Sequence, residues 1–300
     1  MSAAGIDEFG MLAENAAEIG LPWSGPPTVR RTTHEVGGGR SISALHWGSE
    51  PPRLVFLHGG GQNAHTWDTV LLALGVPALA LDLPGHGHSS WRTDRDYAPS
   101  TNAAELAPVI RREAPEAAAV VGMSLGGLTT IALLSVAPDL VRRAVIIDVT
   151  PSTGSRVASM TTAQRGTTAL TRGPAEFDTL EEMVERAVAA APHRPASSLR
   201  RGVIHNTRRT PEGRWAWRYD RPAERVPDFD RLWANVSATS APLTLVRGGD
   251  SSFVADADAE EFVRRSPSAA VHVVAGAGHG VQSDRPLELA GIIREAAGIG

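Results

Sequence analysis

The sequence predicts an α/β fold in which helices cover both faces of a mostly parallel central sheet, with a helical insertion late in the chain. From residue 53 onwards, short apolar runs alternate with segments of helical periodicity. Strands that alternate with helices form parallel sheets with right-handed crossovers. This rhythm stops over 151–240 and resumes over 241–300, which indicates an insertion into one domain.

Composition narrows the class of protein. A chain of 300 residues is long enough for an α/β domain with an insertion. Its net charge of −4 argues against a nucleic-acid partner, because phosphate binding needs a basic face. The absence of cysteine and lysine excludes thiolate nucleophiles, thiolate metal ligands and Schiff bases. We expect neither a secretory signal nor a membrane partner, and therefore a cytoplasmic enzyme.

We expect an N-terminal arm at 1–27, then a core domain made of 28–150 and 241–300. The arm combines an amphipathic helix at 6–19 with a helix-breaking stretch. A glycine-split hairpin should precede six buried parallel strands. The predicted strands, hairpin first, are 28–36, 41–47, 53–58, 78–82, 117–122, 144–149, 243–247 and 271–275. The predicted core helices are 103–113, 125–137, 256–265 and 286–297.

The insertion at 151–240 carries helical stretches, of which 179–191 is the clearest, and no predicted buried strand. It also holds the aromatic residues Trp215, Trp217 and Tyr219. We expect it to form a helical cap, or lid, over the carboxyl edge of the sheet, where ligands bind in open α/β sheets.

Ser124 lies at the centre of a G-x-S-x-G pattern over residues 122–126. The pattern stands between a buried strand and an apolar-periodic helix, which is the setting of a nucleophile elbow. The sharp turn strains the serine backbone, so small residues must flank it, as Gly122 and Gly126 do. We therefore predict Ser124 as a nucleophile and disfavour a glycine-rich helix start without chemistry.

A serine hydroxyl needs a base to remove its proton. His279 is the candidate, because it stands in a glycine-rich loop directly after the last predicted strand. Taken alone, such a residue is more often a surface histidine. Combined with the elbow, its position predicts a general base.

The segment 58–63 leaves the first parallel strand with three consecutive glycines. Residues without side chains let backbone N–H groups approach a developing oxyanion closely. The predicted oxyanion-hole donors are the N–H groups of Gly60 and of Leu125, the residue after the nucleophile. We expect His58 to organise this loop rather than to act as a second base.

Four motifs together resemble the α/β-hydrolase fold family, in particular its capped esterases, lactonases and meta-cleavage-product hydrolases. They are H-G-G-G-Q-N at 58–63, D-L-P-G-H-G-H-S at 82–89, G-M-S-L-G-G at 122–127 and G-A-G-H-G at 276–280. They occur in the family's order and cover 28–150 and 241–300, whereas 151–240 corresponds to the variable cap. The resemblance implies hydrolysis with no metal and no organic cofactor, and a structural role for Asp82.

The acid that orients His279 has two candidates. Members of this family usually carry it in a G-x-x-D pattern after the strand at 243–247, where this chain has Ser251, and Asp250 falls one residue early. A displacement of one residue reverses the direction of a side chain in extended backbone. Asp148 ends the strand beside the elbow strand, and an imidazole N–H would satisfy its buried carboxylate. We favour Asp148 and keep Asp250 as the alternative.

Apolar side chains should line a pocket that has few polar anchors. We predict substrate contacts from Met123, Trp217, Trp91 and Phe253. Trp67 and Trp215 are further candidates for the lining, and His205 could contact a polar substrate group. Each of these aromatic residues, taken singly, is more often a packing residue.

The sequence therefore predicts a serine esterase or lactonase that cleaves a small carboxylic ester or lactone through a Ser-His-Asp catalytic triad and an acyl-enzyme. C–C bond hydrolysis of a meta-cleavage product needs the same triad and is the first alternative. A non-catalytic, hydrolase-like ligand-binding protein is the second.

Overall fold

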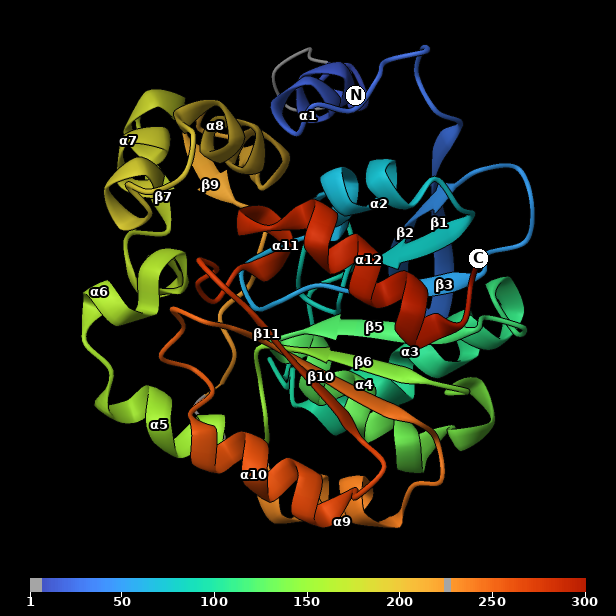
Figure 1. Ribbon diagram of the computed structural model, residues 1–300. Coiled ribbons are helices and arrows are strands. Elements are labelled where there is room, and N and C mark those ends of the chain that lie inside the picture. The colour runs from blue at the N-terminus through green and yellow to red at the C-terminus, as the bar shows by residue number, and fades with distance from the viewer. Residues whose placement is uncertain (1–6, 224–227) are drawn as a thin grey trace.

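An eight-stranded sheet forms the centre of this computed structural model, which describes residues 7–223 and 228–300 (Figure 1). Its strand order is β1-β2-β4-β3-β5-β6-β10-β11. The pairs β1–β2 and β2–β4 are antiparallel, and all remaining neighbours run parallel. The mostly parallel α/β architecture predicted from the sequence is confirmed. The strands are β1 Val29–Gly37, β2 Arg40–Trp47, β3 Leu54–Leu57, β4 Ala78–Leu81, β5 Ala119–Met123, β6 Ala144–Ile147, β10 Leu243–Gly248 and β11 Ala270–Val274.

Each face of the sheet packs against its own layer of helices, because successive side chains of a strand point to opposite faces. On β3, Val55 and Leu57 join the apolar cluster beneath α3, α4, α9 and α10, whereas Leu54 and Phe56 join the cluster beneath α2 and α12 (Figure 1). All four side chains are fully buried. The helices of the two layers are α2 Asp68–Leu74, α3 Pro99–Glu113, α4 Leu125–Val136, α9 Phe229–Ala238, α10 Asp256–Arg265 and α12 Pro286–Ala297.

The inserted segment differs from the all-helical cap that we expected. It contains a three-stranded antiparallel sheet of order β7-β9-β8 in addition to its helices. The central strand, Trp215–Trp217, is buried at all three positions, and three residues are too short to show an alternating pattern. The elements of this segment are α5 Thr153–Ser159, α6 Thr162–Arg165, β7 Glu176–Phe177, α7 Leu180–Ala190, α8 Ala196–His205, β8 Thr207–Arg209 and β9 Trp215–Trp217.

Other boundaries also differ from the prediction. Helix α9 falls within 151–240, yet its Leu232, Trp233 and Val236 belong to the core cluster that holds α3 and α4. Helix α3 begins at Pro99 rather than at residue 103, since proline suits the first turn of a helix. Helix α2 was not predicted.

Within the described residues, none of the helices has the length and apolar character that a membrane span requires.

The N-terminal arm lies against both the core and the inserted segment. Its helix, α1 Leu12–Glu18, covers part of the predicted 6–19, and residue 6 lies outside the described residues. Asn15 donates to the Thr69 hydroxyl of α2 at 2.9 Å. Arg201 of α8 pairs with Glu14 at 3.5 Å and also with Glu18. These contacts connect α8 of the inserted segment to the core through the arm.

A buried histidine extends this connection. His65 bonds Asp68 through Nδ1 at 2.8 Å and Glu8 of the arm through Nε2 at 3.1 Å. Burial by itself would lower the pKa of His65, but the two carboxylates outweigh burial and raise that pKa to about 9. His65 is therefore a cation at neutral pH.

The raised pKa of His65 makes the stability of the folded chain depend on pH, because the folded and unfolded states bind the proton with different affinities. Because the folded-state pKa of about 9 exceeds the ordinary value of 6.5, the stabilisation is complete below pH 6.5 and is lost as pH rises toward 9. We expect the free energy of unfolding of wild type to fall over this interval relative to His65→Gln, measured by urea denaturation. His272→Gln on the edge strand β11 is the control and should follow wild type. Parallel curves for wild type and His65→Gln would contradict the assignment.

Candidate active site

Ser124 occupies the sharp turn between β5 and α4. Its φ of 51° and ψ of −117° place a non-glycine residue in a strained backbone conformation. Its backbone N–H donates to Ile147 O at 3.0 Å, which fixes the turn to the neighbouring strand β6. The strand–turn–helix setting predicted for the nucleophile elbow is therefore the setting that the structure contains.

Two glycines allow this turn to pack tightly. A Cβ on Gly126 would lie 2.2 Å from Leu57 O, and one on Gly122 would lie 2.3 Å from Gly126 O. Neither backbone oxygen can swing aside as a flexible side chain would. The elbow therefore requires glycine at both positions for packing reasons, independently of any chemistry at Ser124.

Asp148 directly follows β6 and is completely buried, with a positive φ of 49°. Its Oδ1 accepts from Gly248 N at 2.9 Å, and its Oδ2 lies 2.8 Å from His279 Nδ1. A carboxylate accepts hydrogen bonds, so this contact places the imidazole proton on Nδ1 and leaves a lone pair on Nε2. His279 Nε2 is buried and makes no hydrogen bond to any described residue.

The two acid candidates occupy different environments. Asp148 contacts His279, whereas Asp250 is exposed and its backbone N–H donates to Ala277 O at 2.9 Å. Ser251, which holds the family's usual acid position, donates its hydroxyl proton to Asp148 Oδ2. This role of Ser251 was not predicted, although a hydroxyl at an expected aspartate position was a signal for it.

The imidazole of His279 is also held from one side by an aromatic ring. Phe253 stacks on it with ring centroids 3.4 Å apart and planes inclined by 10°. Phe253 is itself buried, and it follows Ser251 in the same loop. One loop after β10 therefore fixes the histidine through stacking and fixes its carboxylate partner through a hydroxyl.

The predicted oxyanion donors lie next to one another. A Cβ on Gly60 would stand 3.9 Å from Leu125 Cδ2, so the glycine loop approaches the first residue of α4. Gln62, which the sequence analysis did not single out, accepts from Gly59 N at 2.9 Å and closes the loop. The N–H groups at the start of a helix have no intrahelical partner, so that of Leu125 can serve an oxyanion.

His58 and Asp82 hold the glycine loop in place through buried hydrogen bonds. His58 is fully buried, accepts from Leu83 N at 2.9 Å and contacts Gly59 O at 2.7 Å, and burial lowers its pKa to about 3. Burial raises the pKa of Asp82, but Arg31 and backbone N–H groups outweigh it and hold that pKa at about 2. Neutral His58 and ionised Asp82 thus have the structural contacts expected of loop-organising residues.

A cavity of about 330 Å³ lies between the glycine loop, the arm and the inserted segment. Gly60 and Gly61 form part of its wall, together with Trp217 and His205 from the predicted set. Gln282, which was not predicted, lines it with an amide whose two polar atoms make no hydrogen bond to a described residue. The cavity therefore begins beside one predicted oxyanion donor and offers polar groups to a ligand.

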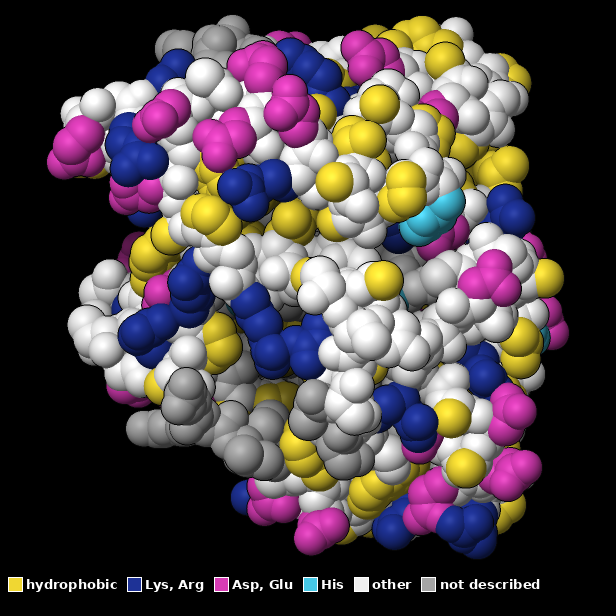
Figure 2. All heavy atoms as spheres, turned by 90° about the vertical axis from the view of Figure 1, so that its left-hand side faces the viewer, with side chains coloured by type: hydrophobic (Ala, Val, Ile, Leu, Met, Phe, Trp, Pro, Cys, Tyr) yellow, Lys and Arg dark blue, Asp and Glu magenta, His cyan; other side chains and the backbone are white. Residues whose placement is uncertain are grey.

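The other predicted contact residues lie elsewhere. Met123 and Trp67 are buried in the apolar cluster that holds α2 and α12, so Trp67 is a core residue rather than a lining residue. Trp91 is 42% exposed, with the Arg208 guanidinium 5.2 Å from its ring centroid. Trp215 is buried beneath Arg209. Figure 2 shows arginine side chains gathered near the centre of the face on which α5, α6 and α7 lie in Figure 1.

The family and the relatives that match this chain, described next, are hydrolases. The model of a family described as the alpha/beta hydrolase family matches residues 54–292. Esterase Rv0045c of Mycobacterium tuberculosis is 56% identical over 292 residues, which are 97% of this chain and 95% of that protein. A mouse sn-1-specific diacylglycerol lipase, ABHD11, is 25% identical over 83% of this chain and 81% of its own length.

The solved structures agree. A crystal structure of esterase Rv0045c superposes with a TM-score of 0.87 at 52% identity, covering 97% of this chain and 98% of that chain. An E-2-(acetamidomethylene)succinate hydrolase has a TM-score of 0.74 at 23% identity, with coverage of 90% and 99%. The second likeness is one of fold alone.

The elbow glycines give a first test. We expect Gly126→Ala to lower the free energy of unfolding by about 3 kcal/mol, because its methyl group would overlap Leu57 O. Gly291→Ala in helix α12 is the matched control, because nothing lies near its Cβ position. It should instead stabilise the protein by about 0.5–1 kcal/mol. Equal effects of the two substitutions in denaturant titrations would contradict the packing argument.

Ser251 gives a second test. We expect Ser251→Ala to lower kcat for an ester by about tenfold with a smaller change in KM, because Asp148 loses one of its hydrogen-bond donors. Ser252→Ala, one residue further along the same loop, should leave both constants near wild type. A Ser251→Ala enzyme with unchanged kcat would show that this hydroxyl does not position the carboxylate.

Proposed function

This chain belongs to the alpha/beta hydrolase family, and we propose that it cleaves carboxylic esters through a Ser124–His279–Asp148 triad and an acyl-enzyme. The family resemblance and the expectation of a hydrolase that acts on ester bonds are confirmed by the family match and the 56% identical esterase. The observation that carries the triad is the 2.8 Å contact between Asp148 and His279. Both residues stand at the carboxyl edge of the sheet, where the strained Ser124 also lies.

The mechanism follows from the protonation pattern of His279. With its proton on Nδ1, the imidazole can use the free lone pair of Nε2 to take the Ser124 hydroxyl proton as the oxygen attacks the ester carbonyl. The carbonyl oxygen becomes an oxyanion, which the N–H groups of Gly60 and Leu125 bind. His279 then donates the proton from Nε2 to the departing alkoxide, which leaves an acyl group on Ser124.

The second half repeats these steps with water. His279 removes a proton from a water molecule, the hydroxide attacks the acyl carbonyl, and Ser124 recovers its proton as the acid leaves. Asp148 stays ionised throughout, holds the imidazole in one tautomer and stabilises its cationic form. Its burial and its bonds to Gly248 and Ser251 keep it in place for both halves.

The cavity beside the glycine loop supports a polar substrate of modest size. It holds about 330 Å³, which is near the lower end of the volumes of small-molecule sites. Its wall carries Gln282 and His205 as well as Trp217, so polar and aromatic groups both face the space. We propose that this cavity takes the part of the ester that lies beyond the carbonyl.

Activity measurements on two aspartate variants test the triad. We expect Asp148→Asn to lower kcat for a short-chain p-nitrophenyl ester by about 10³–10⁴-fold, because the amide favours the wrong imidazole tautomer. Asp250→Asn should stay within about twofold of wild type, since its side chain is exposed and remote from the histidine contacts described above. Ser124→Ala should lose activity and labelling by a fluorophosphonate. A collapse only in Asp250→Asn would overturn the assignment of the acid.

The same enzyme preparation separates the substrate classes. Turnover of open-chain esters above that of lactones of equal carbon number supports the proposal, whereas preferred turnover of lactones would redirect it. Preferred cleavage of a dienoate meta-cleavage product would replace ester hydrolysis by C–C bond hydrolysis. Fluorophosphonate labelling of Ser124 without turnover of any of these compounds would instead indicate a ligand-binding protein.

A further inference from the structure

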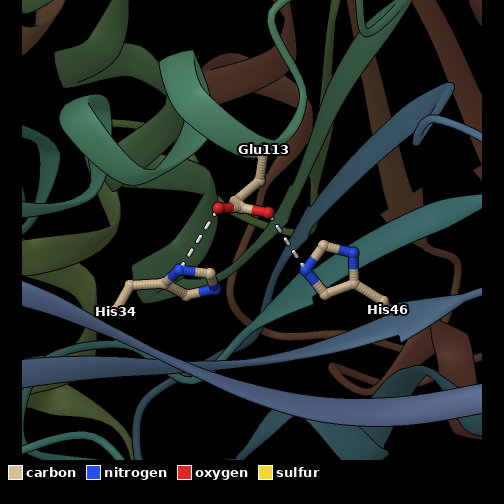
Figure 3. Close-up of side chains that lie close together, drawn as sticks. All are labelled: His34, His46 and Glu113. Atoms are coloured by element: carbon tan, nitrogen blue, oxygen red, sulfur yellow. Dashed lines mark ion pairs between the residues drawn. The ribbon is translucent and has the colours of Figure 1, made fainter.

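Two histidines and a glutamate meet at the junction of β1, β2 and the end of α3, apart from the active site. His34 comes from β1, His46 from β2, and Glu113 is the last residue of α3. Figure 3 shows the Glu113 carboxylate between the two imidazoles, with one oxygen directed at each. The histidine side chains are only 8% and 6% exposed, whereas that of Glu113 is 22% exposed.

The spacing of the donor atoms suits a single small ion. His34 Nδ1 lies 3.3 Å from Glu113 Oε1, and His46 Nε2 lies 3.6 Å from Glu113 Oε2. The three ligand atoms lie within 4.8 Å of one another. Ligands of a tetrahedral zinc ion, bound at about 2.0–2.1 Å, stand roughly 3.4 Å apart. Small side-chain movements would therefore bring all three donors to one ion.

The hydrogen bonds of His34 leave a lone pair on Nδ1, the ring nitrogen that lies near Glu113. The Arg112 guanidinium, which can only donate, lies 2.5 Å from His34 Nδ1, so this nitrogen is an acceptor. His34 Nε2 then carries the proton and donates to the Thr32 hydroxyl at 2.8 Å. A histidine ligand of a metal has the same arrangement, with one nitrogen free and the other N–H fixed by a neighbour.

His46 provides the second observation. Its Nε2 is buried, faces the carboxylate, and makes no hydrogen bond to a described residue. A buried polar atom without a partner is costly unless something else binds it.

Arg112 shows what kind of group the cluster attracts. Its guanidinium donates to His34 Nδ1 and, at 2.9 Å, to Glu113 Oε1, so a cation already contacts two of the three donors. The Arg112 side chain is 52% exposed and is free to turn toward solvent. A divalent ion could take its place and would also satisfy His46.

We propose that His34, His46 and Glu113 form a binding site for a divalent transition-metal ion such as Zn²⁺, with water completing the coordination. Two imidazoles and one carboxylate are ligands that Zn²⁺ accepts readily. The partial exposure of Glu113 gives water access to the remaining position. The ion would join the N-terminal hairpin to α3, and its binding would therefore stabilise the folded chain.

A second cluster, His65, Asp68 and His205, has the same types of residue but a different geometry. The rings of His65 and His205 stack face to face, with centroids 3.7 Å apart and planes inclined by 11°. Both nitrogens of His65 already contact carboxylates, at 2.8 and 3.1 Å. Stacked rings do not direct their in-plane lone pairs at one point, so this cluster serves as an internal control.

The proposed site is remote from the predicted chemistry. His46 pairs with Leu79 near the amino end of β4, whereas Ser124 and Asp148 follow the carboxyl ends of β5 and β6. The strands from β4 to β11 in the sheet order all run in the same direction. His46 therefore lies near the amino ends of these strands, whereas Ser124 and Asp148 lie at their carboxyl ends. Substitutions at the metal site should therefore leave esterase turnover close to wild type.

Calorimetric titration of the tag-free, chelator-treated full chain with Zn²⁺ tests the proposal. We expect wild type to bind one equivalent at this site and its Tm to rise on addition of Zn²⁺. His46→Gln and Glu113→Gln should weaken that binding by about tenfold or more and abolish the Tm shift. Ester turnover of each variant shows that it is folded.

Two further variants distinguish the loss of a metal ligand from a general loss of structure. Arg112→Gln removes the competing cation without touching a ligand, so it should tighten Zn²⁺ binding severalfold, which a general loss of structure would not do. His205→Gln should leave the binding unchanged. Wild-type affinity in His46→Gln, loss of binding in His205→Gln, or weaker binding in Arg112→Gln would each overturn the proposal. Absence of Zn²⁺ binding to wild type would overturn it as well.

Discussion

The buried carboxylate of Asp148 connects the segments that form the candidate active site. It receives hydrogen bonds from Gly248 at the end of β10, from Ser251 after β10 and from His279 after β11. Its own N–H donates to Val246 O at 2.7 Å. A buried carboxylate is tolerated only when its oxygens are satisfied. The parallel pairing of β6 with β10 and of β10 with β11 meets this requirement, because it places three loops at one edge.

The elbow and the glycine loop obey a second constraint, which is close approach of backbone to backbone. Gly126 lies against Leu57 O, and Gly60 lies beside Leu125, so the loop after β3 packs on the start of α4. Buried His58 and Asp82 hold that loop without adding a proton-transfer group, because one is neutral and the other is ionised and paired with Arg31. Packing and electrostatics therefore support the same arrangement of backbone donors.

Four histidines described above illustrate three different electrostatic settings. His279 has one nitrogen fixed by a carboxylate and the other free. His65 lies between two carboxylates and is held as a cation. His34 and His46 share one carboxylate with a guanidinium that can move away. Of these settings, only the first belongs to the proposed triad, and only the third leaves lone pairs able to converge on an ion.

The sequence by itself determined the parallel sheet, the elbow at Ser124 and the preference for Asp148, because these depend on short-range patterns of strand, turn and helix. It also predicted the glycine loop that approaches Leu125. Only the tertiary structure decided that Asp148 rather than Asp250 contacts His279, because that contact depends on how β6, β10 and β11 pair and bring their following loops together. It alone revealed Ser251 and Phe253 around that contact, and the meeting of His34, His46 and Glu113. Ser251 is 103 residues from Asp148, and Glu113 belongs to a different element from either histidine. No local periodicity records a contact that strand pairing and helix packing create.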